Sequence, residues 1–290
     1  MTLLYQIING IQIGAIYALV ALGYSMVYGI VKLINFAHGD IIMVGSYCIW
    51  YAISHMNMPI WLAIIFTIVF CAMLGMLIEK VAYRPLRGAA RISLLITAIG
   101  VSLFLQNLMQ LVFQADPRMF TNIFPGNIYI GSLKFSVSAV VTIVVSVILM
   151  IALWILVNKT KIGTAMRAVS EDTDTAKLLG INVDNTISFT FMLGSALAGA
   201  AAILYCCSYT KIEPTMGSML GLKAFIAAVL GGIGSVPGAV VGGFFIGVAE
   251  SLTKGYISST MSDAVVFGIL ILVLLLKPAG LFGKNLREKV

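Results

Sequence analysis

Runs of apolar residues recur along almost the whole of this chain, and they constrain its fold more than any other feature. The runs cover roughly the ranges 3–29, 38–55, 60–79, 93–113, 135–157, 187–208, 222–251 and 262–276. A helix needs about 20 apolar residues to cross the hydrocarbon core of a bilayer, and most of these runs are long enough. The sequence therefore predicts an all-α, polytopic membrane protein with about eight hydrophobic segments.

The composition is not that of a soluble globular domain. The chain is 60% hydrophobic and 10% charged, whereas a soluble domain has roughly a quarter charged residues. The longest polar stretch, 158–186, is too short to fold as a domain of its own, so we expect one transmembrane domain over 1–290. The first apolar run has no basic segment before it and continues into further spans, which is not typical of a cleavable signal.

The distribution of basic residues predicts which side of the membrane each loop occupies. The net charge is +7, and most of the 18 Lys and Arg residues lie in a few polar breaks. These are Lys32; Lys80, Arg84, Arg87 and Arg91; Lys159, Lys161, Arg167 and Lys177; and Lys277, Lys284, Arg287 and Lys289. By the positive-inside rule these breaks face the cytoplasm. The N-terminus and the loop 114–134, which is marked by Pro and Gly turns, are then outside and the C-terminus is cytoplasmic.

The apolar run 222–251 is interrupted by the glycine- and proline-rich stretch 231–238. Each half is shorter than a full crossing, so we expect a broken or re-entrant segment. The spacings Gly238/Gly242 and Gly243/Gly247 are typical of helices in close contact. No strand–turn–helix pattern surrounds these glycines, which argues against a nucleotide-binding loop.

The polar island 163–180 stands out in an otherwise apolar chain. Gly163 is suited to a helix start, and Gly180 is suited to a helix C-cap. Arg167 and Glu171 are four residues apart, so they can pair on one helix face. A short helix of this kind can bind in a groove of a partner protein, although a solvated loop helix would have the same pattern.

The stretch 35–40, Asn-Phe-Ala-His-Gly-Asp, leaves three interpretations open. It can be a structural cap and hinge, with Asp40 at the start of the second span where a carboxylate suits the helix dipole. It can line a transport pathway, or it can couple transport to protons. Of the carboxylates flanking spans, Glu250 is the best lone candidate for a pathway.

The chain lacks the sequence motifs of several functional classes. The chain has no Walker A, HExxH or CxxC sequence, and its four cysteines have no metal-ligand spacing. We therefore expect neither an enzyme nor a bound cofactor or metal, and no nucleic-acid partner. An ion-coupled secondary transporter would need more intramembrane charge than Asp40, Glu250 and Asp263 offer. An intramembrane enzyme would need a converging nucleophile and base, and no such group is evident.

Four stretches together resemble one protein family. They are 35–40 (Asn-Phe-Ala-His-Gly-Asp), 83–88 (Tyr-Arg-Pro-Leu-Arg-Gly), 163–172 with 179–182, and 228–238. They resemble permease subunits of branched-chain amino acid ABC importers, in the LivH-like branch, and the resemblance runs almost from end to end in the same order. Urea and amide importers have similar permeases, so the resemblance leaves the substrate open.

The resemblance implies a set of partners and site residues. A second homologous permease, cytoplasmic ATP-binding subunits that carry the ATP, and an extracytoplasmic solute-binding protein are expected in the cell membrane. The cytoplasmic coupling segment 158–186 would dock on the ATPase. Its expected coupling residues are Gly163, Arg167, Glu171, Asp172 and Gly180. The expected residues of the translocation path are Asn35, His38, Gly234 and Gly238.

The scarcity of charge also suggests how such a path would look. A site that bound both charges of an amino acid tightly would slow its release. We therefore expect a path of mostly apolar and small side chains, drawn from segments around 35–45 and 225–245, where broken helices expose polar backbone.

Overall fold

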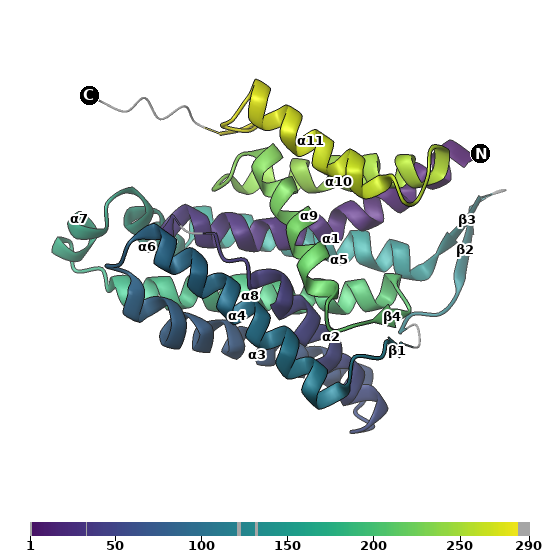
Figure 1. Cartoon of the computed structure of the whole chain (residues 1–290), viewed down its shortest axis with the longest axis horizontal. Helices are drawn as coiled ribbons and strands as arrows, with labels where there is room; N and C mark the ends of the chain where they lie inside the picture. The colour runs from purple at the N-terminus through teal and green to yellow at the C-terminus, as the bar shows by residue number, and fades with distance from the viewer. Residues whose placement is uncertain (1, 33, 121–122, 131–132, 284–290) are drawn as a thin grey trace.

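The computed structural model describes residues 2–32, 34–120, 123–130 and 133–283, and it is almost entirely helical (Figure 1). The long helices are α1 (Thr2–Val31), α2 (His38–Ser54), α3 (Ile60–Ile78), α4 (Arg91–Phe113), α5 (Val137–Lys159), α8 (Val183–Ser208), α9 (Met216–Gly231), α10 (Val236–Tyr256) and α11 (Ser262–Leu276). The short helices are a π-helical turn (Glu79–Tyr83), a 3₁₀ turn (Arg84–Leu86), α6 (Lys161–Glu171) and α7 (Thr173–Leu178). The strands are β1 (Arg118–Met119), β2 (Asn127–Ile130), β3 (Leu133–Ser136) and β4 (Lys211–Ile212).

Most of the long helices lie along the long axis of the molecule, which has two distinct ends (Figure 1). The strands lie at one end, here called the strand end, and α1 begins there. Helices α6 and α7 lie at the opposite end, here called the α6–α7 end. The polar breaks 80–92 and 158–186, which their basic residues place on one side of the membrane, both lie at the α6–α7 end (Figure 1).

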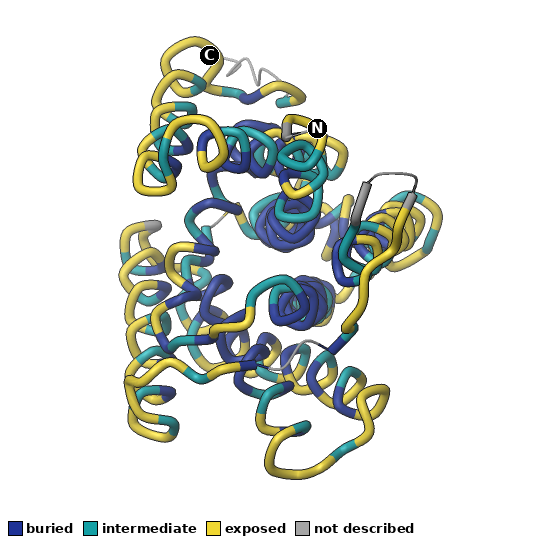
Figure 2. Tube along the Cα trace, turned by 90° about the vertical axis from the view of Figure 1, so that its right-hand side faces the viewer, coloured by how far each residue is buried: buried dark blue, intermediate teal, exposed yellow. Residues whose placement is uncertain are grey.

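Burial follows the pattern of a bundle in lipid rather than in water. Six helices among the described residues are long and apolar enough to cross a membrane: α1, α3 (continued to Leu86), α4, α5, α8 and α10. Helices α1 and α8 are mostly buried, whereas only 22% of the spanning window is buried in each of α3, α4 and α5. Figure 2 shows the buried chain at the centre and exposed chain around it. Apolar residues on the outside suit contact with lipid, and the all-α membrane fold is confirmed.

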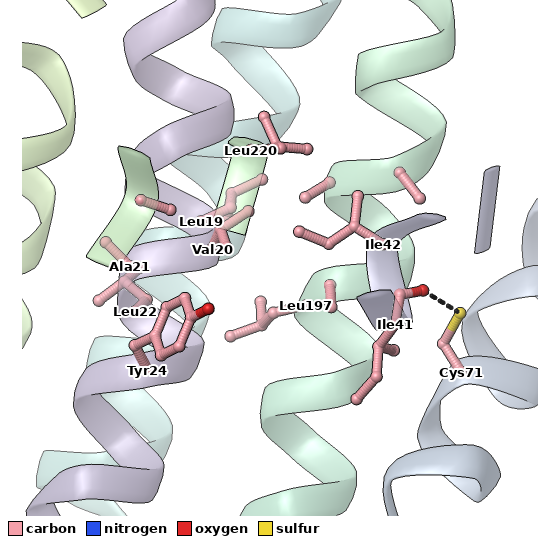
Figure 3. Close-up of a cluster of buried hydrophobic side chains, with 14 of the residues drawn as sticks. Leu19, Val20, Ala21, Leu22, Tyr24, Ile41, Ile42, Cys71, Leu197 and Leu220 are labelled. Atoms are coloured by element: carbon pink, nitrogen blue, oxygen red, sulfur yellow. Dashed lines mark hydrogen bonds between the residues drawn. The ribbon is translucent and has the colours of Figure 1, made fainter. Parts of the chain in front are cut away.

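The core is built where α1, α2 and α8 meet (Figure 3). Leu19 and Leu22 of α1, Ile41 of α2 and Leu197 of α8 are all buried there. The thiol of Cys71 in α3 lies 3.8 Å from the carbonyl oxygen of Ile41 and extends the cluster to the next helix. Cys71, Cys206 and Cys207 are thus small apolar residues of the core, whereas Cys48 is only partly buried.

The packing of α1 against α10 depends on glycine. A Cβ atom added at Gly14 would lie 2.8 Å from the Cα of Phe244, and one at Gly243 would lie 2.5 Å from the Cα of Ala18. One at Gly247 would overlap the backbone of Gly14. The two backbones can be this close because glycine has no side chain. The helix contact predicted from the glycine spacing is confirmed.

The break predicted within 222–251 is present, but one part of that prediction is wrong. Helix α9 ends at Gly231, and α10 begins at Val236 after a turn in which Gly232 and Gly234 have φ of +102° and +91°. The second half is not too short to cross, because α10 extends to Tyr256 and has 21 residues. The apolar run ends at 251, just after Glu250, whereas the helix continues past Lys254 to Tyr256.

The strand end is formed by two small ribbons. β2 pairs antiparallel with β3, and β1 pairs with β4, which brings Arg118 opposite Ile212. The second pair joins the loop after α4 to the connection between α8 and α9. The Pro- and Gly-rich loop expected outside the membrane is thus partly ordered as strands.

Candidate functional site

The connection between α1 and α2 is held by Asn35. The side-chain oxygen of Asn35 accepts hydrogen bonds from the Tyr83 hydroxyl at 2.7 Å and from the backbone N–H of Ala37 at 3.1 Å. Asn35 and Tyr83 are both buried. The contact fixes the start of α2 to the π-helical turn that follows α3, so in this conformation Asn35 supports the backbone.

His38 and Asp40 lie in the first turn of α2 and are fully buried. The ring of His38 meets Tyr24 of α1 edge-on, with centroids 4.9 Å apart. Asp40 accepts a hydrogen bond from the Gln106 side-chain amide at 3.0 Å, and Gln106 also donates to the Ser218 hydroxyl at 2.8 Å. This polar contact joins α2, α4 and α9 where Gly39 and Gly217 bring two helices together.

A group of opposite charges closes the α6–α7 end between α3 and α8. Arg87 pairs with Glu79 and with Asp184, and Arg84 also pairs with Asp184. Glu79 is completely buried and accepts a further hydrogen bond from Ser188. The arginines of 83–88 therefore have a structural role besides their charge, because they fix α8 to the end of α3.

The segment 158–186, which is expected to be the coupling segment, contains two helices instead of the single one expected. Asp172 ends α6 and caps α7, because its carboxylate accepts the backbone N–H groups of Asp174 at 2.9 Å and Thr175 at 3.1 Å. Hydrogen bonds from Thr175 hold the pKa of Asp172 below its usual range. The helix begins earlier than expected, with Thr160 as the cap. Gly163 is instead buried against the last turn of α5, where a Cβ would overlap backbone carbonyls.

The exposed side of this segment is polar with an apolar tip. Arg167 and Glu171 are exposed and do not pair in the part of the chain that the structure describes; Arg167 donates to the Thr164 hydroxyl at 3.4 Å instead. Leu178 and Leu179 are 88% and 74% exposed just before the turn. Gly180 has a φ of +81°, so the predicted glycine cap is confirmed.

Gly234 lies at the α6–α7 end, in the turn between α9 and α10. It lines a small cavity of about 80 Å³ with Gly29 of α1 and Arg167 of α6. Gly238 packs against Gly231 so closely that a Cβ at either position would overlap the other backbone. The structure thus places Gly234 next to the coupling segment and does not bring it together with His38.

A larger cleft of about 750 Å³ opens at the same end. Its lining includes Lys32, Arg87, Lys177 and Asp184. It lies between the end of α1, the turns after α3 and helix α7. A basic cleft beside the coupling segment is suited to an acidic partner surface.

A second charged group lies near the strand end, inside the bundle. Glu250 of α10 is 1% exposed and accepts hydrogen bonds from Lys223 at 2.8 Å, Lys254 at 2.6 Å and the Tyr17 hydroxyl at 2.6 Å. Lys223 also pairs with Asp263 of α11 at 2.6 Å. Glu250 is therefore not a lone carboxylate, as the sequence had suggested, but the centre of an ion-pair network joining four helices.

Comparison with known proteins decides the family. The model of a family described as the permease component of the branched-chain amino acid transport system matches residues 6–274. The chain belongs to this family. The match includes nearly all of the six described helices that are long enough to cross a membrane, so the permease family and the membrane fold agree.

The chain is similar to two permease proteins over nearly the whole length of each. This permease is 43% identical to the high-affinity branched-chain amino acid transport system permease protein BraD of Pseudomonas aeruginosa, over 99% of this chain and 98% of the relative. It is 44% identical to LivH of Escherichia coli K12, with 99% and 97% covered. A solved structure, PsaBC from Streptococcus pneumoniae in complex with a Fab, covers 93% of this chain at 15% identity with a TM-score of 0.49, a likeness too low for a functional comparison.

Two structural features of the permease are not evident in the sequence. Lys223 was not recognised as an intramembrane charge, although it stands inside an apolar run with no other charge from 222 to 249. A charge in such a position is a signal of function or pairing. The role of Tyr83 in holding Asn35 had no local signal, because the two residues are far apart in the chain. No group of His, Cys, Asp or Glu able to hold a metal is present among the described residues.

Proposed function

We propose that this chain is the permease subunit of an ABC importer, and that it translocates branched-chain amino acids across the cell membrane with energy from ATP. The observation that carries the proposal is its 43% to 44% identity, over 99% of its length, with permease proteins of high-affinity branched-chain amino acid transport systems. The chain forms a single transmembrane permease domain, and ATP is bound by separate subunits.

The segment 158–186 is suited to contact with such an ATPase subunit. Helices α6 and α7 project at one end of the bundle, with charged residues and the exposed pair Leu178 and Leu179 on their surface. The adjacent cleft offers basic side chains. We infer that Gly163, Arg167, Glu171, Asp172 and Gly180 form or support this contact, and that a second, homologous permease completes the membrane part.

The path itself is proposed to run beside α2 and the α9–α10 turn. Asn35 and His38 would shape it by fixing the start of α2, and they would contact solute only in a conformation that opens this buried region. Gly234 and Gly238 allow the tight turn at its inner end. An extracytoplasmic solute-binding protein would deliver the amino acid at the strand end.

Reconstitution tests the function directly. The permease is purified with its partner permease and ATPase subunits, placed in proteoliposomes and supplied with the solute-binding protein. We expect ATP-dependent uptake of leucine, isoleucine and valine. Uptake of urea or a short amide in place of all three would favour the alternative importer type, and uptake driven by an ion gradient without ATP would contradict the proposal.

The orientation gives a separate prediction. We expect an impermeant maleimide to label Asp116→Cys but not Asp174→Cys in intact cells, in a background without the four native cysteines. The two positions are exposed at opposite ends of the molecule, and basic residues favour the cytoplasmic side. Permeabilised cells, where both should react, provide the control. Labelling of position 174 from outside would invert the topology.

The coupling role predicts an uncoupled variant. Glu171→Lys reverses an exposed charge on α6, so its stability should change by less than about 0.5 kcal/mol. We expect ATP hydrolysis to continue while leucine uptake falls at least about tenfold, as expected from a loss of about 1.4 kcal/mol at a contact. Asp116→Lys, an exposed charge reversal at the strand end, is the matched control. Normal uptake by Glu171→Lys would exclude this residue from the contact.

A further inference from the structure

A small pocket of about 190 Å³ opens beside β4 at the strand end. Glu250 lies in it, Lys254 and Glu213 reach it from more exposed positions, and Met216 and Leu220 add apolar wall. Pockets for drug-sized ligands occupy about 300–1,000 Å³, so a pocket of this size suits a smaller molecule.

Four charges in and beside this pocket form a neutral group. Glu250 and Asp263 balance Lys223 and Lys254, with contacts of 2.6–2.8 Å. Charged side chains inside a membrane bundle cost free energy, and those that occur there usually face a pathway or pair with another group. A single lysine would be enough to neutralise Glu250 and hold the helices together, whereas Glu250 pairs with two, Lys223 and Lys254.

The side chains nearest the opening carry opposite charges. Lys254 is 35% exposed and has three N–H donors, of which the structure uses one on Glu250. Glu213 is 41% exposed and pairs with Lys211 at 3.1 Å. The more exposed lining of this small pocket therefore includes a cation and an anion, and the same lining has apolar side chains. An amino acid zwitterion has the complementary features: no net charge, two separated charges and, if branched, an apolar side chain.

We propose that this pocket receives the substrate amino acid, with Lys254 binding the α-carboxylate and Glu213 the α-ammonium group. The branched side chain then lies against Met216 and Leu220. Glu250 and Lys223 act as positioning residues, because Glu250 pairs with Lys254 from the buried side and Lys223 in turn pairs with Glu250. The assignment rests on the proposed function and specifies where the amino acid first contacts this subunit. It differs from the path without fixed charge that the sequence suggested.

Photolabelling tests the site in the complete complex. The permease, its partner permease and the ATPases are placed in nanodiscs and exposed to a diazirine analogue of leucine that keeps both main-chain charges. We expect labelled residues within 205–220, competed by excess leucine. Lys254→Gln should lower this labelling about tenfold or more, because it removes a charge-assisted hydrogen bond. Lys254→Arg should retain it, and Lys159→Gln, an exposed lysine at the α6–α7 end, is the control.

The outcomes separate the pocket from the function. ATP-dependent leucine uptake with labels only outside 205–220 overturns the pocket and leaves the proposed function intact. Labels within 205–220 that are unchanged in Lys254→Gln overturn the role of Lys254. Absence of leucine uptake by the wild-type complex overturns the proposed function itself. The labelling map of the wild type stands even if a variant fails to assemble.

Discussion

Gly247→Val is expected to prevent stable folding of the permease. The Cβ atom would overlap the backbone of Gly14, and neither helix can move away, because α10 also packs on α9 and α1 on α8. Overpacking in a close-packed interior costs about 1–3 kcal/mol and sometimes more. Here both surfaces are backbone, which cannot change rotamer, so we expect a loss of about 3 kcal/mol or more. Size-exclusion chromatography of the detergent-solubilised protein, with its thermal unfolding midpoint, measures the effect.

The same change elsewhere in a helix provides the control. Gly268 lies in α11, and a Cβ there would have no neighbour within 4 Å. Gly268→Val should therefore change stability by less than about 0.5 kcal/mol. Equal behaviour of the two variants would show that α1 and α10 do not depend on close backbone contact.

Arg87→Ala is expected to destabilise the α6–α7 end strongly. The substitution leaves the carboxylate of Glu79, which is fully buried, without its cationic partner. Removing one partner of a buried ion pair costs about 3–5 kcal/mol, because the remaining charge stays desolvated. We expect the unfolding midpoint to fall and α8 to become accessible to protease near Asp184. Thermal unfolding and limited proteolysis measure both effects.

Two further variants show whether the buried charge is the cause. Arg84 is 40% exposed and pairs with Asp184, so Arg84→Ala should cost no more than about 1 kcal/mol. Adding Glu79→Gln to Arg87→Ala should recover part of the loss, because the desolvated charge is then gone. If the double variant is no more stable than Arg87→Ala, the pairing with Glu79 is not what stabilises this end.

Much of the fold could be predicted from local patterns. The apolar runs gave the long helices, because the thickness of a bilayer sets a length that composition alone reveals. Gly180 was correctly identified as a helix cap, and the Gly243/Gly247 spacing as a close helix contact. The local pattern did not predict the break at Asp172. There the side chain caps α7 and divides what the sequence suggests is one continuous helix.

The candidate site was predicted less completely. The grouping of 80–92 with 158–186 followed from charge, and both lie at the α6–α7 end. The coupling and path residues stay predictions, since their roles depend on partner chains. The expectation of a path poor in charge overlooked Lys223, whose side chain is paired with both Glu250 and Asp263.

The sequence by itself determined that this protein lies in a lipid bilayer, how long its helices are and to which family it belongs. Hydropathy and motifs are properties of residues that are close together in the chain, so they can be read without the tertiary structure. The tertiary structure alone decided which polar groups meet inside the bundle. Tyr83 reaches Asn35 across 48 residues, Lys223 reaches Glu250 across 27, and Arg87 reaches Asp184 across 97. These pairs depend on how the helices are rotated and packed against one another. The periodicity of apolar residues within one helix does not predict this arrangement.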